Sequence, residues 1–381
     1  MDRPRVALVH DTLQGYGDPE RVLEALHHLY PQAPVYTAYV RPDWADLTGD
    51  RFTGWDLRPL GSGPGPRFWR DSSLADLALP DLWESLDLNA YDLVISSTWG
   101  GLSHGVRVGA HTLHLCYCHS PDRRRWNSPQ QREPWPWERA AQSWLRRYDF
   151  YAAQRVDHWI TNSHRVARRL HRAYRRSADV IPPPVPVQGF GTAGERYYLY
   201  IGDLDRRQQV DVLIQACNRL KQPLQLVGSG PDEAYLRQIA GATVEFLGVR
   251  STADLLDDHI YANAMALVLP TLDLDFSFIA LESMGRGLPI IAYRGSGMAE
   301  ILLDYRTGLF FADPTVDSLG ATIEEFSRLR FLSRACIDRA QEFAEPVFAS
   351  KFDWYVAQAL DEFRAKPGLQ KPPSCADGAG S

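Results

Sequence analysis

Short apolar runs that alternate with helix-like segments constrain the fold of this chain more than any other feature of its sequence. Such runs occur at residues 5–10, 91–96 and 111–118 and again at 197–201 and 266–270. Strands that are apolar along their whole length are typical of parallel sheets buried on both faces. The repeated alternation with helices therefore predicts an α/β fold built from doubly wound, Rossmann-like parallel sheets.

A proline-rich segment, residues 182–186, divides this pattern into two series. Consecutive prolines stiffen the backbone and remove hydrogen-bond donors, as in segments that join domains. We expect an N-terminal domain over residues 1–185 and a C-terminal domain over 186–350, facing each other across a cleft. A helix over residues 351–369, which we expect to return to the N-terminal domain, and a disordered polar tail over 370–381 complete the prediction.

Composition excludes some classes of function. A formal net charge of −6 gives no reason to expect nucleic-acid binding. The chain enters an apolar strand without a signal-peptide pattern, and no run reaches the ~18 apolar residues that span a bilayer, so we expect a cytoplasmic protein, peripheral at a membrane at most. Cys116 and Cys118 lie in one apolar run without further soft ligands nearby, which favours buried thiols over a zinc site.

Several short motifs follow the strands of the second half in a fixed order. They are Gly202-Asp203-Leu204, Gly228-Ser229-Gly230-Pro231, Phe276 through Glu282, and Gly295 through Glu300. Together they resemble the donor-binding half of glycosyltransferase family four, a retaining family with the GT-B fold, over about residues 196–312. In the first half, Val9-His10-Asp11, Cys118-His119-Ser120-Pro121 and Asn162-Ser163 resemble a branch that includes mannosyltransferases of bacterial surface polysaccharide synthesis.

The resemblance implies retaining transfer of a hexose from a nucleotide sugar, with GDP-mannose as the candidate donor, to a glycan or lipid-linked acceptor. The nucleotide sugar is a substrate, and no cofactor or metal is predicted. The leaving diphosphate needs stabilisation of its negative charge, which backbone N–H groups at glycine turns supply in part. His119 and Glu282 are the predicted catalytic residues, with Glu282 also holding the donor. The other predicted donor contacts are Gly17, Gly202, Arg206, Arg207, Gly228, Gly230, Phe278, Ile279 and Glu300.

The sequence departs from the family pattern at the positions that carry charge. Asp203 occupies the position of an arginine, Gln208 that of a lysine, and Leu274 that of the first of two glutamates. Exchanging an attraction for a repulsion at ~4 Å costs several kcal/mol at an effective dielectric constant near 20. Arg206 and Arg207 lie beside the lost lysine position, and a shift of the loop by one residue restores their reach.

Two interpretations therefore remain open at the sequence level. The first is an active glycosyltransferase. The second is a pseudo-enzyme with a degenerate active site that acts as a binding or assembly subunit for a protein partner. Structural roles are the alternatives for single residues: a strand-end histidine for His119, a cap for Glu300, and a favourable place near a helix start for Glu282.

Two arginine-rich segments, residues 123–126 and 165–176, also have two interpretations. The simpler is a solvated helix face. The other is contact with anionic lipid or with a lipid-linked pyrophosphate acceptor, because arginine and tryptophan together suit a membrane surface.

Overall fold

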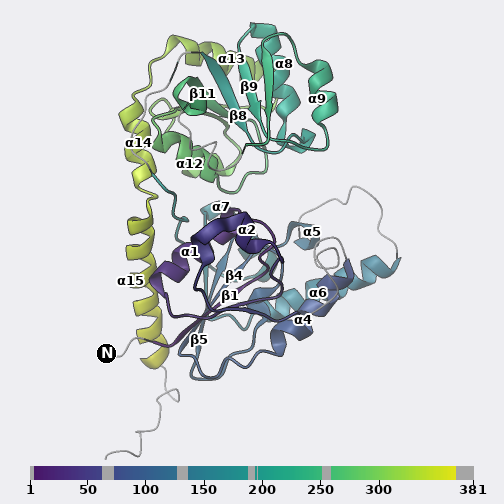
Figure 1. Ribbon diagram of the computed structural model, residues 1–381, viewed down its shortest axis with the longest axis vertical. Coiled ribbons are helices and arrows are strands. Elements are labelled where there is room, and N and C mark those ends of the chain that lie inside the picture. The colour runs from purple at the N-terminus through teal and green to yellow at the C-terminus, as the bar shows by residue number, and fades with distance from the viewer. Residues whose placement is uncertain are drawn as a thin grey trace, which may run out of the picture. The chain divides into compact units, whose positions relative to one another are not determined.

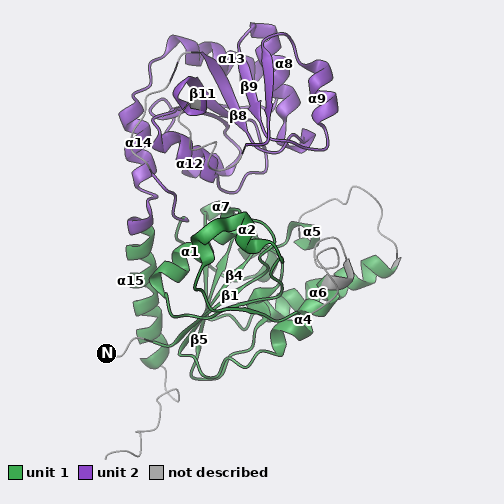
Figure 2. Cartoon of the chain, in the orientation of Figure 1, with its two compact units in different colours: residues 1–182, 348–381 green, residues 183–347 purple. Residues whose placement is uncertain are grey.

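The computed structural model describes residues 4–61, 73–126, 136–187, 194, 196–250 and 259–365 (Figure 1). Contacts along the chain divide it into two units (Figure 2). Residues 1–182 and 348–381 form the first unit, and residues 183–347 form the second. The tail predicted over residues 370–381 lies outside the described residues.

The first unit is built on a seven-stranded parallel sheet in the order β3-β2-β1-β4-β5-β6-β7. Its strands are β1 (Val6–His10), β2 (Val35–Thr37), β3 (Leu57–Pro59), β4 (Leu93–Thr98), β5 (Leu113–Cys118), β6 (His158–Thr161) and β7 (Asp179–Val180). Its helices include α1 (Asp18–Leu29), α2 (Trp44–Thr48), α4 (Ser73–Glu84), α5 (Arg123–Trp126), α6 (Pro136–Ala153) and α7 (His164–Tyr174), with short 3-10 turns at η1 (Gly49–Phe52) and η2 (Ser103–Gly105).

The second unit is built on a six-stranded parallel sheet in the order β10-β9-β8-β11-β12-β13. Its strands are β8 (Tyr197–Ile201), β9 (Leu224–Val227), β10 (Val244–Gly248), β11 (Ala264–Leu269), β12 (Ile290–Tyr293) and β13 (Gly308–Phe311). The helices are α8 (Val210–Leu220), α9 (Glu233–Ile239), α11 (His259–Ala262), α12 (Phe278–Gly285), α13 (Val316–Arg328) and α14 (Ser333–Gln341), with 3-10 turns at η3 (Arg206–Gln208) and η4 (Gly297–Glu300). Two parallel sheets flanked by helices confirm the predicted fold class.

Each sheet buries its faces under amphipathic helices. In the first unit, Leu79 and Trp83 of α4 and Leu145 of α6 share one core cluster with Ala7 and Val94 of the sheet. In the second, residues of α8 and α13, among them Leu213 and Ile323, pack with Leu226 of β9. Because helices cover both faces of each sheet, a ligand can reach only the ends of the strands. The candidate site residues therefore lie at the carboxyl ends of the strands.

Several helices differ from the sequence-based expectation. The last helix, α15 (Glu345–Ala365), begins at Glu345 rather than at residue 351, because Pro346 fits the first helical turn and Phe348 extends the buried stripe of Phe352. Helix α4, which contains Pro80, was not predicted from the sequence.

Strands β8 and β9 end in glycines whose backbones nearly touch. Gly228 follows β9 with a φ of +137°, and a Cβ placed on it meets the carbonyl oxygen of Gly202 at 1.9 Å. That distance is far inside van der Waals contact, so no side chain fits between these two turns. Glycine at residue 228 is therefore a requirement of the fold, whatever else its amide does.

We predict that Gly228→Ala lowers the free energy of unfolding by about 3 kcal/mol, because the new methyl group must push two strand ends apart. Gly54→Ala is the matched control: its φ is +80°, but a Cβ there has nothing within 4 Å. In Gly54→Ala the free energy of unfolding should fall by only about 1 kcal/mol, which is the cost of placing a residue other than glycine at a positive φ. Urea unfolding of both variants measures the difference, and equal losses would show that the close approach relaxes freely.

Candidate active site

The predicted donor residues of the second unit all follow strands that neighbour one another in the sheet. Gly202 and the arginines of η3 follow β8, Gly228 and Gly230 follow β9, Glu282 lies in α12 after β11, and Glu300 ends η4 after β12. Because the strands are parallel, their carboxyl ends meet at one edge of the sheet. The structure thus brings segments far apart in sequence to one edge.

Hydrogen bonds between these loops hold them in place. The amide of Leu204 donates to the carbonyl of Ser229 at 3.0 Å, which joins the β8 loop to the β9 loop. The hydroxyl of Thr271, after β11, donates to Oε1 of Gln208 at 2.8 Å. Four adjacent loops are tied together, since the amide of Gly297 also reaches the carbonyl of Leu274 at 2.6 Å. Gln208, in the position of the family lysine, serves here as a neutral tie between two loops.

Both arginines beside the lysine position have acidic partners. The guanidinium of Arg206 lies 3.9 Å from the centroid of the Tyr235 ring and 3.4 Å from Asp232. Arg207 pairs with Asp205, which also caps η3 by accepting from the Arg207 amide at 2.8 Å. The side chains of Arg206 and Arg207 are 57% and 74% exposed, so both guanidinium groups contact solvent as well as their acidic partners.

Helix α12 begins earlier than expected, and this changes the interpretation of Glu282. Ser277 caps the helix, because its Oγ accepts from the amide of Ala280 at 3.1 Å. Glu282 is therefore beyond the first turn, where the helix dipole no longer favours an acid, and the structural alternative based on that dipole is wrong. Glu282 is half-buried, next to the buried Phe278 and the half-buried Ile279. Ser277 therefore has a structural role as the cap of α12.

His119 follows β5 in the first unit and is buried. Its Nε2 lies 3.0 Å from Oγ of Ser97 on the neighbouring strand, and Asn162 donates to its carbonyl at 3.1 Å. Burial, with a smaller contribution from the charge of His10, lowers the pKa of His119 to about 3. The imidazole is therefore neutral at physiological pH and acts as a hydrogen-bonding group rather than a cation.

Gly17 lies at the start of α1, near the same edge of the first sheet. Its amide donates to Oε2 of Glu20 at 2.8 Å, and Oε1 of Glu20 lies 3.6 Å from Nε2 of His10. His10 in turn packs its ring against Trp99, with 5.0 Å between centroids. A line of contacts thus connects the glycine turn to the loop after β4.

The sequence placed Asp11 in a motif but indicated no role for it, whereas in the structure Asp11 organises this edge. Its Oδ2 accepts three backbone N–H groups, those of Trp99 at 2.7 Å, Gly100 at 3.1 Å and Gly101 at 2.8 Å. Its Oδ1 accepts the amide of Ser103 at 3.0 Å and the hydroxyl of Thr98 at 3.2 Å. The carboxylate is 1% exposed. A polar residue directly after a buried strand was the available signal, but nothing in the sequence says which loop it binds.

Cys116 and Cys118 are buried free thiols, as predicted. In the described ranges no group of three or more His, Cys, Asp or Glu side chains is arranged to hold a metal ion. Among the described helices, none combines the length and apolar character that crossing a bilayer requires.

Two Rossmann-like units with candidate residues at the carboxyl ends of their strands define the class of GT-B glycosyltransferases. The solved structure of HepE from Anabaena in complex with UDP-glucose is similar to this chain, with a TM-score of 0.66 and 15% identity over 92% of this chain and 99% of that one. The family model described as "Glycosyltransferase Family 4" matches residues 19–188, and the one described as "Glycosyl transferases group 1" matches residues 195–328. Between them the two models match both units, so the chain is similar to glycosyltransferases along most of its length and has their GT-B fold.

Curated relatives match this chain at low sequence identity. The D-inositol 3-phosphate glycosyltransferase of Nocardiopsis dassonvillei is 24% identical over 90% of this chain and 88% of its own length. The O-antigen chain mannosyltransferase B of Escherichia coli is 30% identical over 39% of this chain and 42% of its own length. Other relatives are likewise matched over 42–59% of their length.

We predict that acid destabilises the protein in part through His119. The unfolded chain protonates this histidine below pH 6.5, whereas the native state does so only near pH 3, so its contribution to stability is complete above pH 6.5 and is lost as the pH falls toward 3. Between these two pH values, each group of this kind lowers the free energy of unfolding by about 1.4 kcal/mol for every unit that the pH falls. Urea unfolding between pH 6.5 and 4.5 should show a slope smaller by about that amount in His119→Asn. The exposed His171, replaced in the same way, controls for removal of an imidazole; an unchanged slope in His119→Asn contradicts the prediction.

We predict that Asp11→Asn lowers the free energy of unfolding by about 3 kcal/mol. The amide NH₂ of asparagine must face either the backbone donors on one side or those on the other, which leaves buried N–H groups unsatisfied. Asp43→Asn, on an exposed carboxylate paired with Arg41, should leave the free energy of unfolding close to that of the parent. Urea unfolding at pH 7 tests both; a loss at Asp11 no larger than at Asp43 would show that the loop rearranges without cost.

Proposed function

We propose that this protein is an active glycosyltransferase that moves a hexose from a nucleotide sugar to a glycan or lipid-linked acceptor with retention of configuration. The observation that carries the proposal is the interlocked set of four loops at the carboxyl edge of the second sheet. These loops hold the glycine turns and Glu282 in fixed positions relative to one another. Preorganised N–H groups of this kind stabilise developing negative charge without reorganisation during the reaction.

Within this proposal each residue has a role. Amides near Gly202, Gly228 and Gly230 bind the diphosphate, and Glu282 accepts hydrogen bonds from the donor ribose. Phe278, Ile279 and Glu300 complete the donor contacts from α12 and η4. Because Gln208 is neutral and engaged with Thr271, the cations nearest the diphosphate are Arg206 and Arg207, which exchange Asp232 and Asp205 for phosphate oxygens.

The acceptor side is assigned to the first unit. Its neutral His119 accepts or donates a hydrogen bond at the transferred sugar, held in place by Ser97. Gly17, in the turn at the start of α1, is assigned to contact with the donor, as the family resemblance implies. Mannose as the transferred hexose, with GDP-mannose as donor, draws support from the E. coli relative, whose name specifies a mannosyltransferase. The UDP-glucose in the HepE structure supports a nucleotide sugar as the donor, but it does not indicate which nucleobase the donor of this protein carries.

We further propose that the protein works in the cytoplasm, with peripheral contact to the membrane where a lipid-linked acceptor resides. The support is the exposed basic face of α7, which includes Arg168 and Arg172 and is continued by Arg175 at the C-cap. Clusters of arginine attract anionic lipid headgroups by about 1 kcal/mol per residue.

We predict that calorimetry with a panel of UDP-, GDP- and ADP-sugars finds at least one donor with a dissociation constant in the micromolar range, about −8 kcal/mol. Glu282→Ala should weaken that donor about tenfold or more, because the ribose hydroxyls lose their acceptor. Glu324→Ala, on the exposed face of α13, should leave the affinity unchanged and serves as the control.

Two outcomes separate the alternatives. No heat from any nucleotide or nucleotide sugar removes the enzyme proposal and leaves the assembly-subunit interpretation. Binding of a nucleotide to which the sugar adds no affinity indicates a nucleotide-responsive regulator instead. If transfer occurs, proton NMR of the product reads its anomeric configuration, and inversion contradicts the retaining mechanism.

A further inference from the structure

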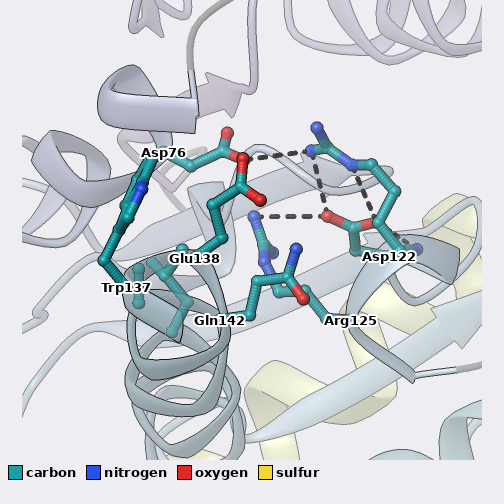
Figure 3. Close-up of a pocket in the computed structure, with 9 residues that line it drawn as sticks. Asp76, Asp122, Arg125, Trp137, Glu138 and Gln142 are labelled. Carbon is teal, nitrogen blue, oxygen red and sulfur yellow. Dashed lines mark hydrogen bonds and ion pairs between the residues drawn. The ribbon is translucent and has the colours of Figure 1, made fainter. Parts of the chain in front are cut away.

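A pocket in the first unit lies outside the residues discussed so far. It lies between α4, the segment at the start of α5, and α6, and its cavity has a volume of about 90 Å³. Figure 3 shows Asp76, Asp122, Arg125, Glu138 and Gln142 with their polar ends turned toward one another, and Trp137 at one side.

The lining combines hydrogen-bond acceptors, donors and an aromatic ring. Asp76, Asp122 and Glu138 supply carboxylate oxygens, whereas Arg125 and Gln142 supply N–H groups. These acceptors and donors match the hydroxyl groups of a sugar ring, because each hydroxyl both donates and accepts hydrogen bonds. The Trp137 side chain is 52% exposed, so its indole offers an apolar face at the rim. A pyranose has the same two characters, with polar edges and an apolar C–H face that packs on aromatic rings.

The charges of the side chains that line the pocket favour some classes of ligand over others. Three carboxylates and two arginines, Arg124 and Arg125, line the pocket, and both arginines already pair with Asp122, at 3.1 Å and 3.3 Å. Arg124 also lies 3.3 Å from Asp76. A phosphate entering this pocket meets an excess of negative charge. A neutral sugar meets no such penalty, so the lining favours a saccharide over a phosphorylated ligand or a lipid headgroup.

The inner wall of the pocket is rigid and is tied to the carboxyl edge of the first sheet. Arg125 is 3% exposed, and its Nη2 donates to the carbonyl of Gly100 at 2.9 Å. Gly100 is the residue whose amide Asp11 binds at 3.1 Å. Asp122 comes three residues after His119 in the same loop. The pocket is therefore joined by direct contacts to the loops that hold the candidate acceptor-side residues.

We propose that this pocket binds a neutral sugar ring of the acceptor glycan, with Trp137 packing on the ring and Asp76, Glu138 and Gln142 bonding its hydroxyls. Saccharide binding here is independent of any donor. Its assignment to the acceptor rests on the proposed glycosyltransferase function. The pocket thus contributes to selection of the acceptor rather than to the chemical step.

The test uses the full-length protein without nucleotide. Ligand-observed NMR with methyl α-mannoside, methyl α-glucoside and methyl α-galactoside, and with α-linked disaccharides of the same sugars, should detect binding of at least one. Trp137→Ala and Gln142→Ala should each weaken it about fivefold or more. Trp144→Ala is the matched control, because Trp144 is 45% exposed on the same helix but does not line the pocket, and it should stay within about twofold of the parent.

Three results overturn the proposal. The first is that none of these saccharides binds, and the second is that Trp144→Ala weakens binding as much as Trp137→Ala. The third comes from sedimentation with vesicles of phosphatidylglycerol and phosphatidylcholine. If both tryptophan variants lose vesicle binding while saccharide binding is unaltered, the exposed aromatic face of α6 contacts lipid.

Donor calorimetry on Trp137→Ala keeps this proposal separate from the proposed function. Unchanged donor affinity together with weakened saccharide binding supports the pocket as a distinct subsite. If the parent protein binds saccharide in a Trp137-dependent way but binds no nucleotide sugar, the transferase function fails and the saccharide pocket stands.

Discussion

The carboxylate of Asp11 is the interaction on which the candidate acceptor side depends. It follows the central strand β1 and accepts four backbone amides from the loop after the neighbouring strand β4 and one hydroxyl from Thr98 at the end of that strand. A buried charge is stable only when hydrogen bonds replace its water, and this loop supplies them. Because Gly100 also accepts from Arg125, the same contact extends to the wall of the pocket beside α6.

Hydrogen bonds between neutral groups tie the loops of the second unit, and its two central strand ends approach so closely that only glycine fits. Gln208, at the position for which the family resemblance implies a lysine, ties two of these loops, and Ser277 caps α12. In the function proposed above, diphosphate binding depends on backbone amides and on Arg206 and Arg207.

The general architecture was predictable because it depends on local patterns. Apolar strands alternating with helices specify parallel sheets, and the ordered glycine motifs place the donor residues after successive strands. Helices whose pattern was weak were missed or shortened, as with α4, interrupted by Pro80, and α15, which starts at Glu345. The position of Glu282 within α12 was also misjudged, since the cap at Ser277 had not been recognised.

By itself, the sequence determined the fold class and the order of the candidate residues along the chain, since both follow from periodicity and short-range motifs. Tertiary structure decided which loops Asp11 binds, that Gln208 pairs with Thr271, and that Asp76, Asp122 and Gln142 line one pocket. These contacts join residues from separate elements, and their partners are chosen by the order of strands in the sheet. Burial, which makes His119 neutral, likewise arises only when those elements pack together.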